Sequence, residues 1–250
     1  MPATDDLTYP VSLTPPDISA YRKGNSGVEY IHQFDSGKPG PHVMISAVVH
    51  GNELCGAIAL DHLLQNEVRP LRGKLTLAFM NVSAFLSFDP GNPTFSRFID
   101  EDFNRLWSKD VLGGNHDSVE LRRAREVHPI VDTVDMLLDI HSMQTTTLPL
   151  IVAGPLVKGR EFARQLGIPE MVVSDSGHKA GRRMRGLRWF FRSGQSEKCF
   201  VDRMRTALGS EQCGVGDHCG VAFSLEIRRD FGRNRRTALS GAASGKTTFR

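Results

Sequence analysis

VMISAVVHGNELCGAIALDHLL, residues 43–64, carries the strongest structural signal in the chain. Its first part, Val43 to Val49, is a continuous apolar run rich in β-branched residues, which is typical of a strand buried on both faces. From Glu53 to Leu64 the apolar residues recur at helical spacing, so a helix should follow and pack on the sheet. The stretch therefore predicts a strand, a tight turn and a helix.

Segments on both sides of this unit extend the same alternation. We predict strands at Lys74–Met80, Asp135–Ile140, Leu150–Ala153 and Met171–Val173, and a helix at Val119–Val131. The turn-rich residues 1–40 should wrap the domain or start an edge strand. Strands that alternate with helices favour an α/β fold with a mixed, mostly parallel sheet flanked by helices on both faces.

Two histidines follow predicted strands directly. His50 ends the first strand, and His141 ends the strand that begins at Asp135. Ligands of open α/β sheets bind beyond the carboxyl ends of the strands. We therefore expect both imidazoles at the same rim of the sheet.

His50 and Glu53 lie three residues apart at a strand-to-helix turn, a spacing that lets both side chains converge on one ion. With His141 they make three nitrogen and oxygen ligands and leave a fourth position for water, as in a catalytic zinc site. We therefore predict one Zn²⁺ per chain, held by these three residues. Asp139 points to the same side of its strand as His141 and could accept the second ring proton of a ligand histidine.

A histidine three residues before a glutamate is common by chance, so the neighbouring motifs matter more. HGNELCGAIAL (residues 50–60), RFIDEDFNRLW (97–107) and DIHSM (139–143) occur in this order along the chain. They resemble the zinc and substrate motifs of the succinylglutamate desuccinylase/aspartoacylase family. The resemblance runs from about residue 43 to about residue 185.

The resemblance implies the fold of zinc carboxypeptidases and hydrolysis of the amide between an acyl group and an amino acid. It also implies that Asn104 and Arg105 bind a substrate carboxylate, as guanidinium groups do through paired hydrogen bonds. Arg97 is similar to the family arginine that polarises the scissile carbonyl. Alternatively, both arginines are solvated and Asn104 caps a turn. We interpret Cys55 as a buried, inert thiol.

The end of the chain departs from the family pattern. The family uses a glutamate in a motif resembling IECGQHW as general base, and residues 186–250 contain no such motif. These residues are basic, with 12 Lys and Arg against 6 Asp and Glu. A one-base shift of plausible codons for Cys199 to Gly209 reads ALLIECGQHW. Our hypothesis is a catalytic domain over 1–185 and an atypical tail over 186–250 that is a frame-shifted remainder of the same domain. Glu226 is the tail glutamate in an apolar, strand-like context, and it would replace the missing base only by coincidence.

The predicted function is a zinc-dependent deacylase acting on a small N-acyl substrate that carries a carboxylate. The alternatives are a carboxypeptidase-like peptidase and a catalytically impaired zinc-binding protein. We expect no nucleic-acid partner despite the basic tail. No apolar run approaches the roughly 18 residues of a membrane span, and the acidic N-terminus does not resemble a secretory signal, so we expect a cytoplasmic protein. His178 is a further candidate near the site, and the acyl group, the amine and the oligomeric state stay open.

Overall fold

The computed structural model describes residues 11, 13–143, 148–153, 156–167, 169–174, 184 and 199–207. The strands are β1 (Ile31–Asp35), β2 (His42–Ala47), β3 (Lys74–Phe79), β4 (Met136–Met143), β5 (Leu150–Ala153), β6 (Met171–Ser174) and β7 (Cys199–Ala207). The α-helices are α1 (Leu54–Gln65), α2 (Val82–Leu86), α3 (Lys109–Leu112), α4 (Val119–Val131) and α5 (Val157–Leu166). Short 3₁₀ turns lie at η1 (Ser19–Tyr21), η2 (Pro93–Ser96) and η3 (Phe103–Arg105). In this part of the chain, none of the helices has the length and apolar character needed to cross a bilayer.

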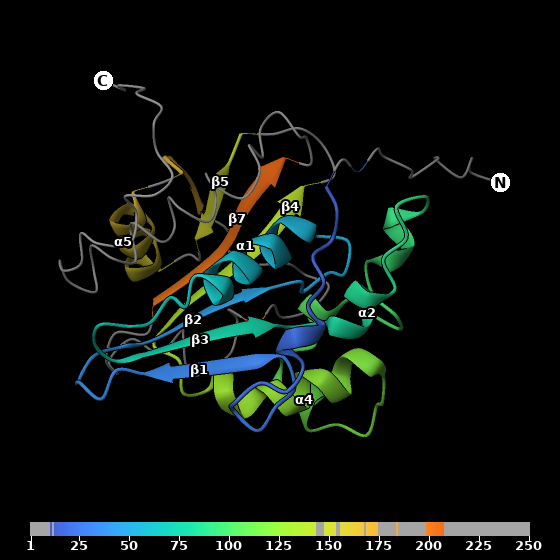
Figure 1. Cartoon of the computed structure of the whole chain (residues 1–250), viewed down its shortest axis with the longest axis horizontal. Coiled ribbons are helices and arrows are strands. Elements are labelled where there is room, and N and C mark those ends of the chain that lie inside the picture. Colours follow the sequence, from blue (N-terminus) through green and yellow to red (C-terminus); the bar gives the residue numbers. More distant parts are fainter. Residues whose placement is uncertain are drawn as a thin grey trace.

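The described strands form one sheet in the order β1-β3-β2-β4-β7-β5-β6 (Figure 1). β2 lies between β3 and β4 and is parallel to both. β7 is parallel to β4, and β6 is parallel to β5. Antiparallel pairing occurs where β1 meets β3 and where β5 meets β7. The predicted α/β fold with a mixed, mostly parallel sheet is therefore confirmed.

Side chains of β2 alternate between two hydrophobic clusters, as the period of two in a strand requires. Val43 and Ile45 pack in the cluster that contains the apolar residues of α1. Met44 packs in the other cluster, with Ala124 and Val127 of α4. All six residues of β2 are buried. The two helices therefore cover opposite faces of the sheet, and β2 is its central, fully buried strand.

Gly56 sets the distance between α1 and the sheet. A Cβ atom at this position would lie 2.7 Å from Ala47 Cβ and 3.0 Å from the carbonyl oxygen of Ile140. Only glycine allows the helix to approach β2 and β4 this closely. The close approach brings the first turn of α1, which follows Glu53, next to the end of β4.

The structure corrects the predicted position of His141. We expected this histidine beyond the end of its strand, but β4 runs on from Met136 to Met143. The reason is pairing with β7, in which His141 lies opposite Arg205 and Ser142 opposite Thr206. A sequence pattern that stops at Ile140 cannot reveal this continuation, because the partner strand comes about sixty residues later.

The tail has no clear strand periodicity in its sequence, yet Cys199–Ala207 forms β7. Its position explains the strand: backbone pairing with β4 on one side and β5 on the other compensates for the absence of an alternating pattern. The domain boundary near residue 186 stays a prediction. His178 and Glu226 lie outside the described residues.

Candidate metal centre and substrate clamp

The turn between β2 and α1 is shaped by two unusual positions. Val48 has a φ of +54°, a left-handed conformation that is rare for a β-branched residue and marks a strained backbone. Gly51 has no room for a side chain, because a Cβ atom there would lie 2.2 Å from the backbone of Ala84 and 2.3 Å from the carbonyl oxygen of Ser96. The turn is therefore held in one conformation, with His50 between these two positions.

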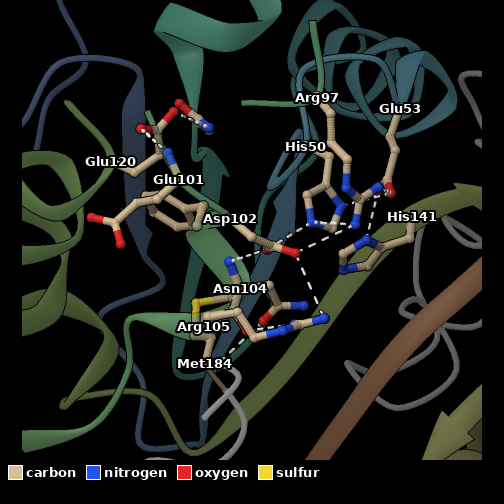
Figure 2. A network of polar contacts seen from close by, with 12 residues as sticks. His50, Glu53, Arg97, Glu101, Asp102, Asn104, Arg105, Glu120, His141 and Met184 are labelled. Carbon is tan, nitrogen blue, oxygen red and sulfur yellow. Dashed lines mark hydrogen bonds and ion pairs between the residues drawn. The ribbon is translucent and has the colours of Figure 1, made fainter. Parts of the chain in front are cut away.

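Glu53 occupies the position before the first turn of α1 but makes no side-chain cap to the helix. Its carboxylate instead lies between two imidazole rings. Oε1 is 2.7 Å from His50 Nδ1, and Oε2 is 2.6 Å from His141 Nδ1. Figure 2 shows these side chains pointing toward one another from the turn and from β4.

These three residues fit a metal ion. One ligand atom from each of them lies within 4.8 Å of the others, and all three side chains are buried. Two imidazole nitrogens and a carboxylate oxygen are the donor set of catalytic zinc sites that keep an open position. The three predicted ligands therefore form one candidate site for a single metal ion.

The charges at this site favour a cation. Burial alone would raise the pKa of the Glu53 carboxyl, but attraction to His141 and His50 outweighs burial and holds that pKa well below its usual range. Burial would lower the pKa of His141, but attraction to Glu53 and Asp139 raises it to about 10. The centre therefore stabilises positive charge at the point where the three side chains meet.

Each histidine has a carboxylate at its other ring nitrogen. Asp139 Oδ2 lies 2.7 Å from His141 Nε2, and Asp139 Oδ1 accepts a hydrogen bond of 2.7 Å from Ser46. Asp102 Oδ1 lies 3.1 Å from His50 Nε2. With Nε2 of each ring directed at a carboxylate, Nδ1 of each ring is directed at Glu53. Such partners fix the tautomer and orientation of ligand histidines.

Asp102 also connects the metal centre to the predicted substrate residues. Its Oδ2 lies 3.6 Å from Arg97 Nη2 and 3.6 Å from Arg105 Nη2. Its Oδ1 accepts the backbone N–H of Asn104 at 2.9 Å. Burial alone would raise the pKa of Asp102, but its bond to His50 and the charges of His50 and both arginines lower it. Asp102 is therefore a carboxylate that orders both halves of the site.

Arg97 borders the metal centre. Its Nη2 approaches His50 Nε2 to 2.9 Å, and its Nη1 lies 3.7 Å from Glu53 Oε1. The backbone carbonyl of Arg97 accepts the N–H of Gly51, which ties the arginine to the metal-binding turn. About a quarter of its side chain is exposed, at 28%. This guanidinium can therefore meet both a bound cation's ligands and a molecule that enters from solvent.

Asn104 and Arg105 lie in η3 on the other side of Asp102 (Figure 2). Asn104 is buried, and its Oδ1 accepts the backbone N–H of Met184 at 3.4 Å. Among the described residues, no acceptor lies within hydrogen-bonding distance of Asn104 Nδ2. Arg105 Nη1 donates to the carbonyl oxygen of Asn104 at 2.9 Å. We call Arg97, Asn104 and Arg105 the clamp.

Sequence reasoning missed Asp102. The signal was present, because Asp102 precedes Asn104 by two residues just as Asp139 precedes His141 by two. The alternative in which Asn104 caps a turn does not hold, since the cap of η3 is the side chain of Asp102. Cys55 is buried as predicted, with its Sγ 2.9 Å from Ser142 Oγ.

The curated relatives found by sequence similarity are N-acyl-aromatic-L-amino acid amidohydrolases (carboxylate-forming). The protein of Rattus norvegicus is 28% identical over 121 residues, which are 45% of this chain and 36% of the relative. That of Xenopus tropicalis is 30% identical over 131 residues, 50% of this chain and 40% of the relative. The chain thus spans less than half the length of these relatives.

Solved structures with the same fold include murine aminoacylase 3, with a TM-score of 0.54 at 19% identity over 76% of this chain and 64% of that one. Succinylglutamate desuccinylase from Vibrio cholerae gives a TM-score of 0.57 at 15% identity, over 85% and 64%. Residues 39–197, more than half of the chain, match the succinylglutamate desuccinylase/aspartoacylase catalytic domain. This match spans the metal centre and the clamp, and the chain belongs to the succinylglutamate desuccinylase/aspartoacylase family.

Proposed function

We propose that this protein is a zinc-dependent deacylase that hydrolyses the amide bond of a small N-acyl amino acid. The observation that carries the proposal is the buried centre of His50, Glu53 and His141 beside the guanidinium groups of Arg97 and Arg105. Zinc bound by the three ligands supplies Lewis-acid activation of a water molecule and of the acyl carbonyl. The substrate class follows from the family and from the charge of the clamp.

The clamp residues would divide the work of binding and orientation. Arg105 carries a positive charge and a planar donor group that suit a carboxylate. Asn104 Nδ2 is a buried donor without an acceptor among the described residues, and such a donor is costly unless a ligand satisfies it. Arg97 lies nearest the metal ligands, where a donor can stabilise negative charge that develops on the scissile carbonyl oxygen. Asp102 holds the two arginines apart and oriented.

The position of the general base falls on β7. Replacing residues 199–208 by ALLIECGQHW puts glutamate at residue 203. Arg203 lies at an irregularity in the pairing of β7 with β4, between the partners of Asp139 and Ile140. Arg205, which pairs with His141, follows this irregularity by two residues. Cys199–Ala207 contains no glutamate, so we propose that the chain as written binds zinc and turns over slowly.

The test compares four chains: the parent, Arg203→Glu, the ten-residue replacement and His141→Ala. Metal content is measured after exposure to zinc, and hydrolysis is followed with N-acetyl-L-phenylalanine, N-acetyl-L-aspartate and a dipeptide with a free C-terminus. We expect one zinc in every chain except His141→Ala. We also expect the replacement to raise the rate by about a hundredfold to ten-thousandfold, the usual contribution of a general base.

Three results would refute the proposal. Zinc bound equally by the parent and by His141→Ala would remove the metal centre. Cleavage of the dipeptide in preference to both N-acetyl amino acids would favour the carboxypeptidase-like alternative. A replacement chain that binds zinc yet cleaves none of the three substrates would show that the family activity is absent.

A further inference from the structure

Glu120 is a fully buried carboxylate that the proposed reaction does not use. It is the second residue of α4, and its side chain is completely buried. Its Oε1 accepts from Asn81 Nδ2 at 3.1 Å and from the N–H of Ile99 at 2.7 Å. Its Oε2 accepts from the N–H groups of Asp100 at 3.0 Å and Glu101 at 3.3 Å. Four donors converge on this side chain, three of them from successive backbone positions.

Residues 99–101 also accept hydrogen bonds from the start of α4 and from the residues just before it. Asp100 Oδ2 accepts the N–H of Val119 at 2.8 Å, in the first turn of α4. Glu101 Oε1 accepts from Ser118 Oγ at 2.5 Å and lies 2.7 Å from His116 Nε2. Residues 99–101 and the start of α4 therefore hold each other through side chains from both segments. We call these contacts the α4 clasp.

The α4 clasp lies directly before the clamp in the chain. Asp102, which orients both arginines, follows Glu101, and Asn104 and Arg105 come next. Arg97 is held separately, by its carbonyl on the metal-binding turn. Fixing three consecutive N–H groups leaves little freedom for the peptide that carries Asp102. The clasp should thus determine where Asn104 and Arg105 lie, with little effect on Arg97 or the metal ligands.

We propose that Glu120 is a positioning residue for the substrate carboxylate: through residues 99–101 it sets the place of Asn104 and Arg105. This inference rests on the proposed function for the identity of the ligand. A carboxylate is required because it accepts at both oxygens, whereas a glutamine would direct an NH₂ group at backbone N–H donors. Its side chain bonds the N–H groups of residues 99–101 and the amide of Asn81, and none of these partners is a metal ligand or a clamp side chain. Three of the four bonds go to the loop, so its main effect on the clamp should pass through residues 99–101.

The decisive variant is Glu120→Gln, with Glu126→Gln as the matched control. Glu126 lies on the same helix, but its side chain is 60% exposed and contacts Arg123. Hydrogen exchange is measured by mass spectrometry on zinc-loaded full chains, and peptides over residues 97–107 are compared with peptides of β2 and β3. We expect Glu120→Gln to speed exchange at residues 99–101 by about tenfold or more, the effect of losing one charged hydrogen bond. Exchange in β2 and β3, zinc content and the control should not change.

Kinetics supply the second measurement, on the replacement chain with N-acetyl-L-phenylalanine. Glu120→Gln should raise KM by about tenfold while kcat changes by less than about threefold, because the clamp binds the carboxylate and Arg97 stays in place. If no chain turns over, the proposed function fails, and exchange at residues 99–101 still decides the role of Glu120.

Three results would overturn the assignment. They are unchanged exchange at residues 99–101, a fall in kcat at constant KM, and loss of zinc by a folded Glu120→Gln chain. Should Glu120→Gln fail to fold, Asp100→Ala takes its place, since it removes the side-chain acceptor of the Val119 N–H and leaves the backbone donors to Glu120 in the chain. Faster exchange confined to residues 97–107 would then support the α4 clasp, and unchanged exchange would refute it.

Discussion

Asp102→Asn tests whether the metal centre and the clamp are ordered by one carboxylate. The change keeps an acceptor for His50 Nε2, now 3.1 Å from Asp102 Oδ1, but removes the charge that faces Arg97 and Arg105. Mutating such a partner of a ligand histidine costs about 10- to 100-fold in metal affinity. Because asparagine can still accept from the ring, we expect the lower figure, about tenfold or 1.4 kcal/mol. Asp102→Ala removes the acceptor as well and should approach about a hundredfold.

The same substitution weakens two ion pairs. Both lie at 3.6 Å, and the arginine side chains are 28% and 22% exposed, so solvent screens them in part. Each pair should therefore contribute at most about 1 kcal/mol, and Asp102→Asn should lower the free energy of unfolding by about 1–2 kcal/mol. Asp110→Asn, the same chemical change at an exposed position of α3, is the control for both measurements.

Zinc affinity is measured by competition with a chromophoric chelator, and stability by urea unfolding of the zinc-free chain. The reasoning predicts an ordered series, with affinity falling from the parent to Asp102→Asn and again to Asp102→Ala. Equal affinities in all three chains would show that Asp102 does not orient His50. Lower stability without a change in affinity would leave Asp102 as a residue of the clamp alone.

Three further substitutions or conditions follow from the geometry. Gly51→Ala must move the backbone of Ala84 or Ser96, so it should cost about 1–3 kcal/mol or more in urea unfolding and weaken zinc binding. Gly27→Ala, where a Cβ atom meets nothing within 4 Å but φ is +85°, should lower stability through backbone strain alone and leave zinc binding unchanged. Cys55→Ala should keep the rate of hydrolysis, since a thiol nucleophile would require an exposed sulfur and this one is buried; loss of turnover would contradict the zinc mechanism. In the folded protein the pKa of Asp102 lies below the unfolded value of about 3.9, so the charged carboxylate stabilises the fold above that pH and loses this effect as the pH falls. The difference in free energy of unfolding between the parent and Asp102→Asn should therefore shrink below about pH 4. A difference that stays constant with pH would refute this.

Elements whose residues are close in sequence were predicted well, because the formation of each element follows from a local pattern. The apolar run from Val43 predicted β2, and helical spacing predicted α1 and α4 to within a residue or two. The order of strands and helices also predicted that His50 and His141 would lie close together, which they do, with ring centroids 5.4 Å apart. Local pattern therefore suffices for β2, α1 and α4, whereas the three metal ligands also required the resemblance of the motifs around them.

Features that depend on distant partners were not predicted. β7 has no clear alternating pattern, yet its backbone pairs with β4 and β5. Glu120 reads in the sequence as one more charged residue of an amphipathic helix, yet it is completely buried, because the loop at residues 99–101 supplies its donors. Neither the pairing of β7 nor the burial of Glu120 can be predicted from the residues next to it in the sequence.

Metal binding and turnover have different structural origins in this chain. The three ligands come from the turn after β2, the start of α1 and β4, all of which precede residue 186. The position proposed for the general base comes from β7, which pairs with β4 and β5. Under the proposed function, a chain altered in β7 keeps its metal ligands and its clamp but loses rate. Stoichiometric zinc in this protein would therefore establish the centre without establishing catalysis, and the two must be measured separately.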